Sequence, residues 1–309
     1  MAKHKVSYFR ATMLAILLAF CASVAALFVA DVSYIDGKSV VAALQSSAVR
    51  DAFLLTLVAS VVSTALAVIV AVPCGYALSR HPFRGAIVLD VMIDALIVLP
   101  PLIIGISLLV VFRQGTDLGV PGVELLKRAG RLLEDGGFVG TCAGAAAAVA
   151  GYILFLVGRA FAWLSLVFVY EAPGVVLAMF FCSASYAIRV MKATFDQLDP
   201  RTEQVAMTLG CTRAGAFRRV TLPLSRQGLI AAAVLSWARA AGIFGPVMIV
   251  AGAVEHRTQV LPTSIFLEIS IGHLRLALVI SMIMIAMAVV VLFTLKTFSK
   301  SSLFGAGGT

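Results

Sequence analysis

The 309-residue sequence is poor in charge. Asp, Glu, Lys and Arg together make up 13% of its residues, whereas 61% are hydrophobic, and the mean hydropathy is +1.05. Soluble domains carry roughly a quarter charged residues, and so large a surplus of apolar side chains cannot be buried in one soluble core. The scarcity of charge therefore excludes an ordinary soluble domain and predicts a chain that is solvated by lipid.

Motifs of catalytic and metal sites are also missing. The sequence contains no GxxxxGK[ST] loop, so the chain does not bind ATP through a P-loop of its own, and it has no HExxH, GxSxG or EF-hand pattern. No two cysteines stand at CxxC spacing, which argues against a disulfide framework and against a zinc site. We expect a non-catalytic protein without a cofactor or a bound metal.

The sequence does contain six long apolar runs. They cover residues 12–30, 53–78, 86–112, 173–190, 228–253 and 274–295. Each is long enough, at 1.5 Å per helical residue, to cross a hydrocarbon layer of about 30 Å, and within lipid only a helix satisfies its own backbone. The runs predict an all-α integral membrane protein with six core transmembrane helices. The length of the first run favours an uncleaved span over a removed signal peptide.

Lys and Arg residues fall on one side of the membrane if the six runs alternate in direction. They precede the first run, lie between the second and third and between the fourth and fifth, and follow the last. Such an excess marks the cytoplasmic side. Both termini and the segment 196–226 are therefore expected in the cytoplasm. The net charge of +9 is explained in this way, so nucleic-acid binding is not expected.

Residues 113–171 form a hydrophobic insertion between the third and fourth core runs. The insertion begins polar and becomes apolar from Phe138 to Tyr170, interrupted by Arg159. An odd number of extra crossings would reverse the charge bias of the following loop. Two interpretations remain: an external amphipathic helix followed by a re-entrant or surface-lying hydrophobic hairpin, or two short extra spans.

A spaced motif lies in the segment 196–226. Gln204-Val205-Ala206 is followed by three residues, Gly210, nine residues, and then Val220-Thr221-Leu222-Pro223. This pattern resembles the cytoplasmic EAA loop of ABC-importer permeases, in which Glu-Ala-Ala, Gly and Ile-x-Leu-Pro stand at the same spacing. The resemblance implies a short helix that docks on an ATPase subunit. The implied coupling residues are Glu203, Gln204, Ala206, Gly210, Phe217, Leu222 and Pro223.

Local chemistry is consistent with a folded knob here. Asp199 can cap a helix that has Pro200 at its first position. Glu203 in the first turn suits the helix dipole, and Gly210 permits a left-handed turn. A second short helix would present Phe217 beside a basic face, as the apolar tip of the knob.

A second stretch, 238–262, narrows the resemblance to molybdate, tungstate and sulfate permeases. It reads Ala-Arg-Ala-Ala-Gly-Ile-Phe-Gly, then Gly252, then Arg-Thr-Gln-Val-Leu-Pro. Ile243 stands where those permeases usually have Glu, and Gln204-Val205 departs from Glu-Ala. The resemblance covers 53–112 and 172–295 of a single permease domain.

The resemblance implies a permease for a tetrahedral oxyanion that works with cytoplasmic ABC ATPase subunits. An external solute-binding protein and a second permease copy, expected to form a homodimer, would complete the importer. An importer for another solute, such as ferric ion, thiamine or polyamine, is the alternative in the same class. A secondary transporter without an ATPase is the alternative in a different class, although no convincing inverted repeat supports it.

Three charged residues fall inside predicted spans, where charge is costly and needs a partner or a cavity. Asp90 and Asp94 lie one helical turn apart, and Arg239 lies in the fifth span. Arg239 is expected to form an ion pair with one of these carboxylates, to offer its charge to a passing oxyanion, or to snorkel. Breaks expected at residues 73–75, 100–101 and 242–246 are either gate hinges or fixed kinks.

Overall fold

A computed structural model describes residues 2–80, 84–117, 119–134 and 138–304, and within these ranges the chain forms helices and no strands. The helices are α1 (Ala2–Tyr34), α2 (Gly37–Gln45), α3 (Ser47–Arg80), α4 (Ala86–Val98), α5 (Pro101–Asp117), α6 (Gly119–Glu134), α7 (Phe138–Phe168), α8 (Ala172–Gln197), α9 (Arg201–Thr208), α10 (Arg213–Ala216), the π-helix η1 (Phe217–Thr221), α11 (Leu222–Leu224), α12 (Arg226–Ala241), α13 (Gly245–Val250), α14 (Leu261–Ile271) and α15 (Leu274–Phe304). The protein is therefore an all-α integral membrane protein, as the sequence predicts.

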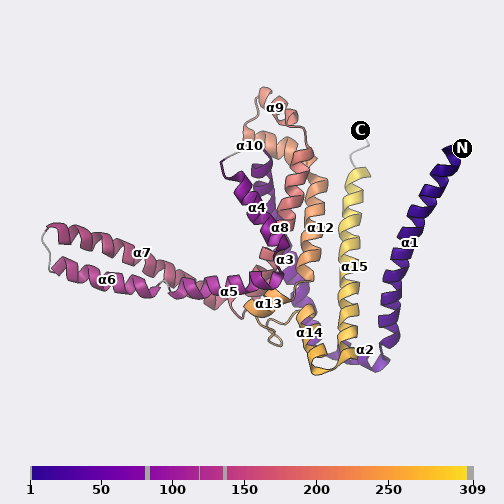
Figure 1. Ribbon diagram of the computed structural model, residues 1–309, viewed down its shortest axis with the longest axis horizontal. Coiled ribbons are helices and arrows are strands. Elements are labelled where there is room, and N and C mark those ends of the chain that lie inside the picture. Colours follow the sequence, from indigo (N-terminus) through magenta and orange to yellow (C-terminus); the bar gives the residue numbers. More distant parts are fainter. Residues whose placement is uncertain (1, 81–83, 118, 135–137, 305–309) are drawn as a thin grey trace.

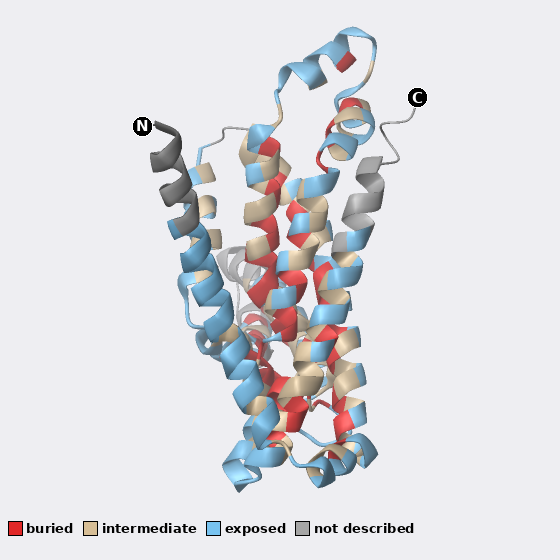
Figure 2. Ribbon diagram, turned by 90° about the vertical axis from the view of Figure 1, so that its right-hand side faces the viewer, coloured by how far each residue is buried: buried red, intermediate tan, exposed pale blue. Residues whose placement is uncertain are grey.

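Helices α3, α8 and α12 form the centre of the bundle (Figures 1 and 2). α3 buries a series of small residues against α8, α12 and α14, and the series comprises Ala52, Thr56, Ala59, Ser60, Ser63, Ala67, Ala71 and Gly75. Small residues at this helical spacing let backbones approach closely in lipid. A Cβ at Gly75 would lie 2.9 Å from the backbone nitrogen of Lys192. Glycine at this position therefore sets how closely α3 and α8 cross.

Two of the six apolar runs are not single helices. The run 86–112 divides between α4 and α5 at Leu99–Pro100, and the run 228–253 divides between α12 and α13 at residues 242–244. These are the breaks expected from the proline pair and from Gly242. The break expected at 73–75 is wrong, because α3 continues as one helix through Pro73. Lipid-facing proline is tolerated where neighbouring helices satisfy the freed carbonyl.

Helical stretches long and apolar enough to cross a membrane number six among the described residues. They are Thr12–Tyr34, Ser47–Arg80, Pro101–Arg131, Ala147–Phe168, Ala172–Gln197 and Leu274–Leu295. Four of them correspond to predicted core spans. The other two fall largely or wholly in the insertion, whose residues 118 and 135–137 lie outside the described part of the chain.

The insertion is a helical arm, α6 and α7, which extends sideways from the bundle as a continuation of α5 (Figure 1). α6 and α7 pack against each other along α6. Glycines make this packing close: a Cβ at Gly122 would lie 2.6 Å from the backbone nitrogen of Phe155, and one at Gly151 would lie 2.9 Å from the carbonyl oxygen of Gly122. The two helices therefore touch backbone to backbone.

A tight elbow joins α7 to α8. Tyr170 adopts φ 59°, a conformation that side chains rarely take, and its backbone N–H donates to the carbonyl oxygen of Val250 at 3.0 Å. A Cβ at Gly174 would lie only 1.9 Å from the carbonyl oxygen of Phe168. Arg257 adds an ion pair to Glu171 at 2.7 Å. The direction of the arm is thus fixed against α13.

Helix α1 stands apart from the central bundle, and its described side chains are almost all exposed (Figures 1 and 2). The beginning of α1, the end of α15 and helices α9 and α10 lie at one end of the molecule, and α2 and α14 lie at the other (Figure 1). This arrangement groups the beginning of α1 and the end of α15 with the segment 196–226.

Candidate functional site

The candidate site is the coupling segment, residues 198–225, which connects α8 to α12. It folds as α9, a turn at Gly210, and the short helices α10, η1 and α11. Asp199 Oδ1 accepts a hydrogen bond from the backbone nitrogen of Arg201 at 2.9 Å, but Asp199 is not the N-cap residue that the sequence predicts. α9 begins at Arg201, and Pro200 is its N-cap residue rather than its first residue.

Gly210 has φ +90°, as expected of a left-handed turn residue. A Cβ built there would meet nothing within 4 Å. Glycine is therefore needed for its backbone conformation and not for space. After this turn Thr212 Oγ1 accepts from the backbone nitrogen of Gly215 at 3.1 Å and starts α10.

Glu203 points into the protein and not toward the outer face of α9. Its carboxylate accepts hydrogen bonds from the Tyr76 hydroxyl at 2.8 Å and from the Thr221 hydroxyl at 2.7 Å. Arg80 Nε lies 3.6 Å from the same carboxylate, and both side chains are largely buried. Arg80 Nη2 also donates to the carbonyl oxygen of Leu198 at 2.7 Å. This Glu203 clamp ties α9 to the end of α3 and to η1.

Phe217 also faces inward. Its ring lies 4.7 Å from the ring of Tyr76 and 6.3 Å from that of Phe195, measured between centroids. The expectation that Phe217 forms the apolar tip of the knob is therefore wrong. Packing on Tyr76 and Phe195 buries the ring more fully than an exposed tip would. Phe217 anchors the coupling segment on α3 and α8.

The outward face of the segment is formed by α9 itself. Gln204 is exposed, Val205 is 58% exposed and Leu209 is 81% exposed. Ala206 is buried, Leu222 is half-buried and Pro223 is exposed. Leu209 did not stand out in the sequence, because an apolar residue before a turn glycine usually packs inward. The face thus combines apolar side chains with one amide, a composition suited to a protein partner.

The two carboxylates of α4, Asp90 and Asp94, pair with α8. Arg189 forms ion pairs with Asp94 and, at 3.1 Å, with Asp90, and Lys192 lies 2.9 Å from Asp90. The ion pair expected between Arg239 and these carboxylates is therefore wrong. α4 packs on α8, so its acidic face meets the basic residues near the end of that helix. The four charges satisfy one another.

Arg239 lies elsewhere, over the ring of Tyr186 with its guanidinium carbon 5.4 Å from the ring centroid. Its Nε is buried, and no described residue accepts a hydrogen bond from it. In the same region the Ser236 hydroxyl donates to the carbonyl oxygen of Ser183 at 3.5 Å. A guanidinium held by a ring and lacking a carboxylate keeps donors for an anion.

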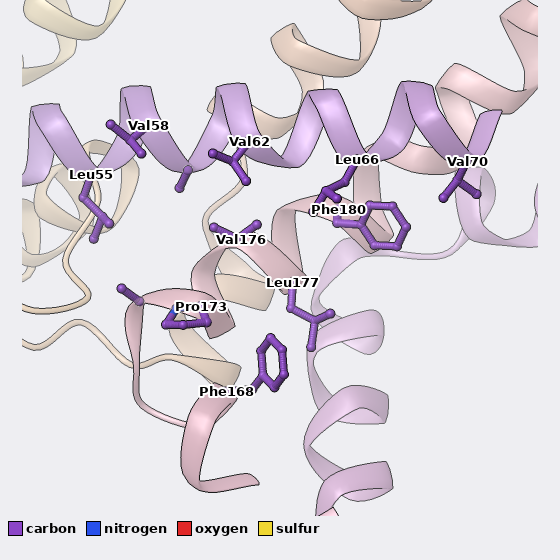
Figure 3. A pocket seen from close by; sticks show the side chains of 12 residues that line it. Leu55, Val58, Val62, Leu66, Val70, Phe168, Pro173, Val176, Leu177 and Phe180 are labelled. Carbon is purple, nitrogen blue, oxygen red and sulfur yellow. The ribbon is translucent and has the colours of Figure 1, made fainter. Parts of the chain in front are cut away.

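The groove on the outside of α3 and α8 is entirely apolar (Figure 3). Its volume is about 590 Å³, and it runs beside α3 from Leu55 to Val70, with Phe168 and Phe180 along its other wall. A cavity without a donor or a positive charge cannot stabilise an anion. The lining of this groove therefore offers no group that would bind a charged solute.

Comparison with known proteins matches the sequence to one family over residues 63–301, the "Binding-protein-dependent transport system inner membrane component". The chain is 26% identical over 246 residues to the sulfate transport system permease protein CysT of Salmonella typhimurium, covering 80% of this chain and 75% of that protein. It is 29% identical over 234 residues to a probable molybdenum ABC transporter permease protein of Haloferax volcanii, covering 76% and 70%. The molybdate/tungstate transport system permease protein WtpB of Thermococcus kodakarensis is 26% identical over 245 residues, covering 79% and 77%.

Proposed function

The chain belongs to the family of inner membrane components of binding-protein-dependent transport systems, and we propose that the solute it imports is a tetrahedral oxyanion such as sulfate, molybdate or tungstate. It is a multi-pass permease subunit of an ABC importer. Relatives named for sulfate, molybdenum and molybdate/tungstate transport support this substrate class. The observation that carries the proposal is Arg239, whose buried Nε has no partner among the described residues.

The coupling segment is the contact for the ATPase subunit. Its outward face is Gln204, Val205 and Leu209, and its inner side is fixed by Glu203 and Phe217. A knob held this firmly moves as one body with α3 and α8. ATP-driven closure of two ATPase subunits would therefore draw two such knobs together and shift the spans between inward-facing and outward-facing states.

A second permease copy completes the pathway. Helix α1 is exposed along its described length and contributes almost nothing to the bundle of its own chain. Two copies of this chain would give each α1 a protein neighbour and would place two coupling segments beside two ATPases. The α2–α14 end, opposite the coupling segment, is the external face on which a solute-binding protein would sit, and both termini lie in the cytoplasm.

Uptake by proteoliposomes tests the substrate class. The permease would be reconstituted with the ATPase and the binding protein that purify with it, and ATP-dependent uptake of radioactive sulfate, molybdate and tungstate would be measured. We expect uptake of at least one of these oxyanions, with competition by the others. Uptake that only ferric ion, thiamine or a polyamine can compete would overturn the substrate assignment, and uptake without ATP would overturn the ATPase partnership.

Arg239→Gln tests the residue that carries the proposal. This change removes the charge but keeps a polar side chain of similar reach, so folded yield should remain near that of the unchanged protein. We expect the apparent affinity for the oxyanion to fall at least tenfold, because a desolvated anion loses its charged partner. Gln114→Asn, at an exposed position of α5 that the proposal does not use, serves as the control for non-specific loss of uptake.

A further inference from the structure

We propose that the α6–α7 arm is a membrane-interface anchor that lies in the headgroup region of the outer leaflet, with α7 against the acyl chains and α6 toward water. The placement in the outer leaflet rests on the orientation proposed above. The partner surface is a phospholipid bilayer, recognised through an apolar face on one helix and a basic face on the other.

The apolar face is on α7. Exposed large side chains recur at helical spacing along it, and they are Val149, Tyr152, Ile153, Leu156, Trp163 and Leu166. Residues three, four and seven apart share one side of a helix, so these side chains form one stripe. The exposed Arg159, three residues after Leu156 and four before Trp163, lies within this stripe and interrupts it. Two of them, Tyr152 and Trp163, are of the type enriched where hydrocarbon meets headgroups. The stripe is suited to lipid and not to water.

The charged face is on α6. Glu124, Lys127, Arg128 and Arg131 are all exposed, whereas Ala129 is buried against the neighbouring helix. The three basic side chains form no ion pair with any residue that the structure describes, so they remain available to lipid phosphates. A helix with an apolar side on its partner and basic residues on the other side is typical of proteins that lie in the membrane interface.

The two helices of the arm lie in the order that such a location requires. In Figure 1 the arm runs across the axis of the bundle, with α7 on the side of the α9–α10 end and α6 on the side of α14 and α2. With the α2–α14 end outside the cell, α7 faces the bilayer and α6 faces external water. Arg159, on α7, has its guanidinium carbon 5.8 Å from the ring centroid of Phe155. The aliphatic part of an arginine side chain is long enough to bring the guanidinium to the headgroups.

The arm is also stiff enough to hold this position. A Cβ at Gly115 would lie 2.3 Å from the ring of Phe161, so α5 and α7 are interlocked where the arm leaves the bundle. The elbow at Tyr170 fixes the other connection. A crossing of the membrane by α6 would place Lys127, Arg128 and Arg131 in hydrocarbon, where charge is costly. Lying in the interface avoids that cost.

Tryptophan fluorescence tests the proposal in the full-length protein. The chain has two tryptophans; Trp163 is 65% exposed, and Trp237 is 2% exposed with an Nε1 that lacks a partner among the described residues. Trp237→Phe therefore removes no hydrogen bond and leaves Trp163 as the only tryptophan. This variant would be reconstituted in vesicles whose phospholipids carry bromine either near the headgroup or near the middle of the acyl chain.

We expect bromine near the headgroup to quench Trp163 at least twofold more than bromine deep in the chain. Stronger quenching by the deep bromine would show that α7 spans the membrane and would overturn the proposal. Quenching by aqueous iodide without quenching by either bromine would show that the arm lies in water or against protein, and would overturn it as well. Trp163→Phe, measured alongside, supplies the emission that belongs to Trp237.

Labelling with an impermeant maleimide separates the arm from the orientation. Lys127→Cys and Glu255→Cys would be introduced singly into a variant whose native cysteines are replaced by alanine, and both should react from outside intact cells. Failure of Lys127→Cys alone would overturn the arm's location. If Glu255→Cys does not react with the maleimide from outside, the proposed orientation and the outer-leaflet placement are overturned. The bromine quenching would then still show how deep Trp163 lies in the bilayer.

Discussion

Replacing Glu203 with alanine should weaken ATPase docking although this side chain does not face the ATPase. The carboxylate accepts hydrogen bonds from Tyr76 and Thr221 and lies beside Arg80, and its side chain is only 14% exposed. These contacts hold α9 in the position in which Gln204 and Leu209 face outward. Without them α9 must be ordered at the moment of docking, and the cost appears as lost affinity.

The size of the effect follows from the hydrogen bonds. Each bond to a charged group contributes about 1.5 to 3 kcal/mol, so loss of both from Glu203 costs about 3 kcal/mol at the lower end. Arg80 still holds the start of the segment through the Leu198 carbonyl oxygen, so part of the order survives. If half of this energy has to be spent on ordering α9 when the ATPase docks, the Kd of the ATPase rises about tenfold.

A double-mutant cycle in nanodiscs would measure this. The Kd of the ATPase would be determined for Glu203→Ala, Tyr76→Phe and the double variant. Tyr76→Phe removes one of the bonds that Glu203→Ala already removes, so the double variant should bind no more weakly than Glu203→Ala alone. Gln204→Ala is the matched control, because it changes the outward face and should add fully to Tyr76→Phe.

Additive effects of Glu203→Ala and Tyr76→Phe would refute the clamp. They would mean that Glu203 contacts the ATPase directly and that its bond to Tyr76 contributes nothing to docking. An unchanged Kd in Glu203→Ala would refute it too, since α9 would then be held by Phe217 alone.

Three further predictions concern other positions. Gly210→Ala should weaken ATPase docking several-fold, because a residue with a Cβ in the left-handed conformation costs about 1–2 kcal/mol. Gly37→Ala, at a glycine without backbone strain, should leave docking unchanged. Equal ATPase binding by the two variants would contradict this reasoning. Arg189→Gln should lower the folded yield, because Asp90 and Asp94 lose their shared partner. Adding Asp94→Asn should restore part of the yield, which size-exclusion chromatography would measure. A double variant with no higher yield than Arg189→Gln would refute the pairing. Gly75→Val should reduce folded yield sharply, because a Cβ there already approaches the backbone of Lys192 to 2.9 Å; wild-type yield would disprove the close crossing.

Much of the architecture was predictable because lipid leaves a chain few options. Length and hydropathy identified 12–30, 53–78, 173–190 and 274–295 as helices, and each lies within one continuous helix of the structure. The spacing around Gly210 predicted its left-handed turn, since few residues other than glycine adopt that conformation. These features depend on interactions between residues that are close together in the sequence, so a short stretch of sequence is enough to predict them.

Apart from the break expected at 73–75 and the position of Pro200, the errors concern side-chain partners. An ion pair of Arg239 with Asp90 or Asp94 was one of three expectations for Arg239, but α4 packs on α8 and its carboxylates pair with Arg189 and Lys192 instead. Phe217 was assigned to the surface because its neighbours are basic, but Tyr76 and Phe195 offer it an aromatic pocket. Such partners come from segments far apart in the sequence, and only the three-dimensional packing shows which of them meet.

The short helix α13 contacts both segments that connect the arm to the bundle. Gly105 of α5 lies against Pro246, where a Cβ would come within 2.7 Å of its Cα, and the Tyr170 backbone bonds to the Val250 carbonyl oxygen. The contact at Gly105 and the hydrogen bond from Tyr170 therefore both involve the six residues of α13. Neither of them depends on side chains of the arm beyond Gly115. The distal part of the hairpin can therefore change in length or sequence without disturbing the central helices α3, α8 and α12.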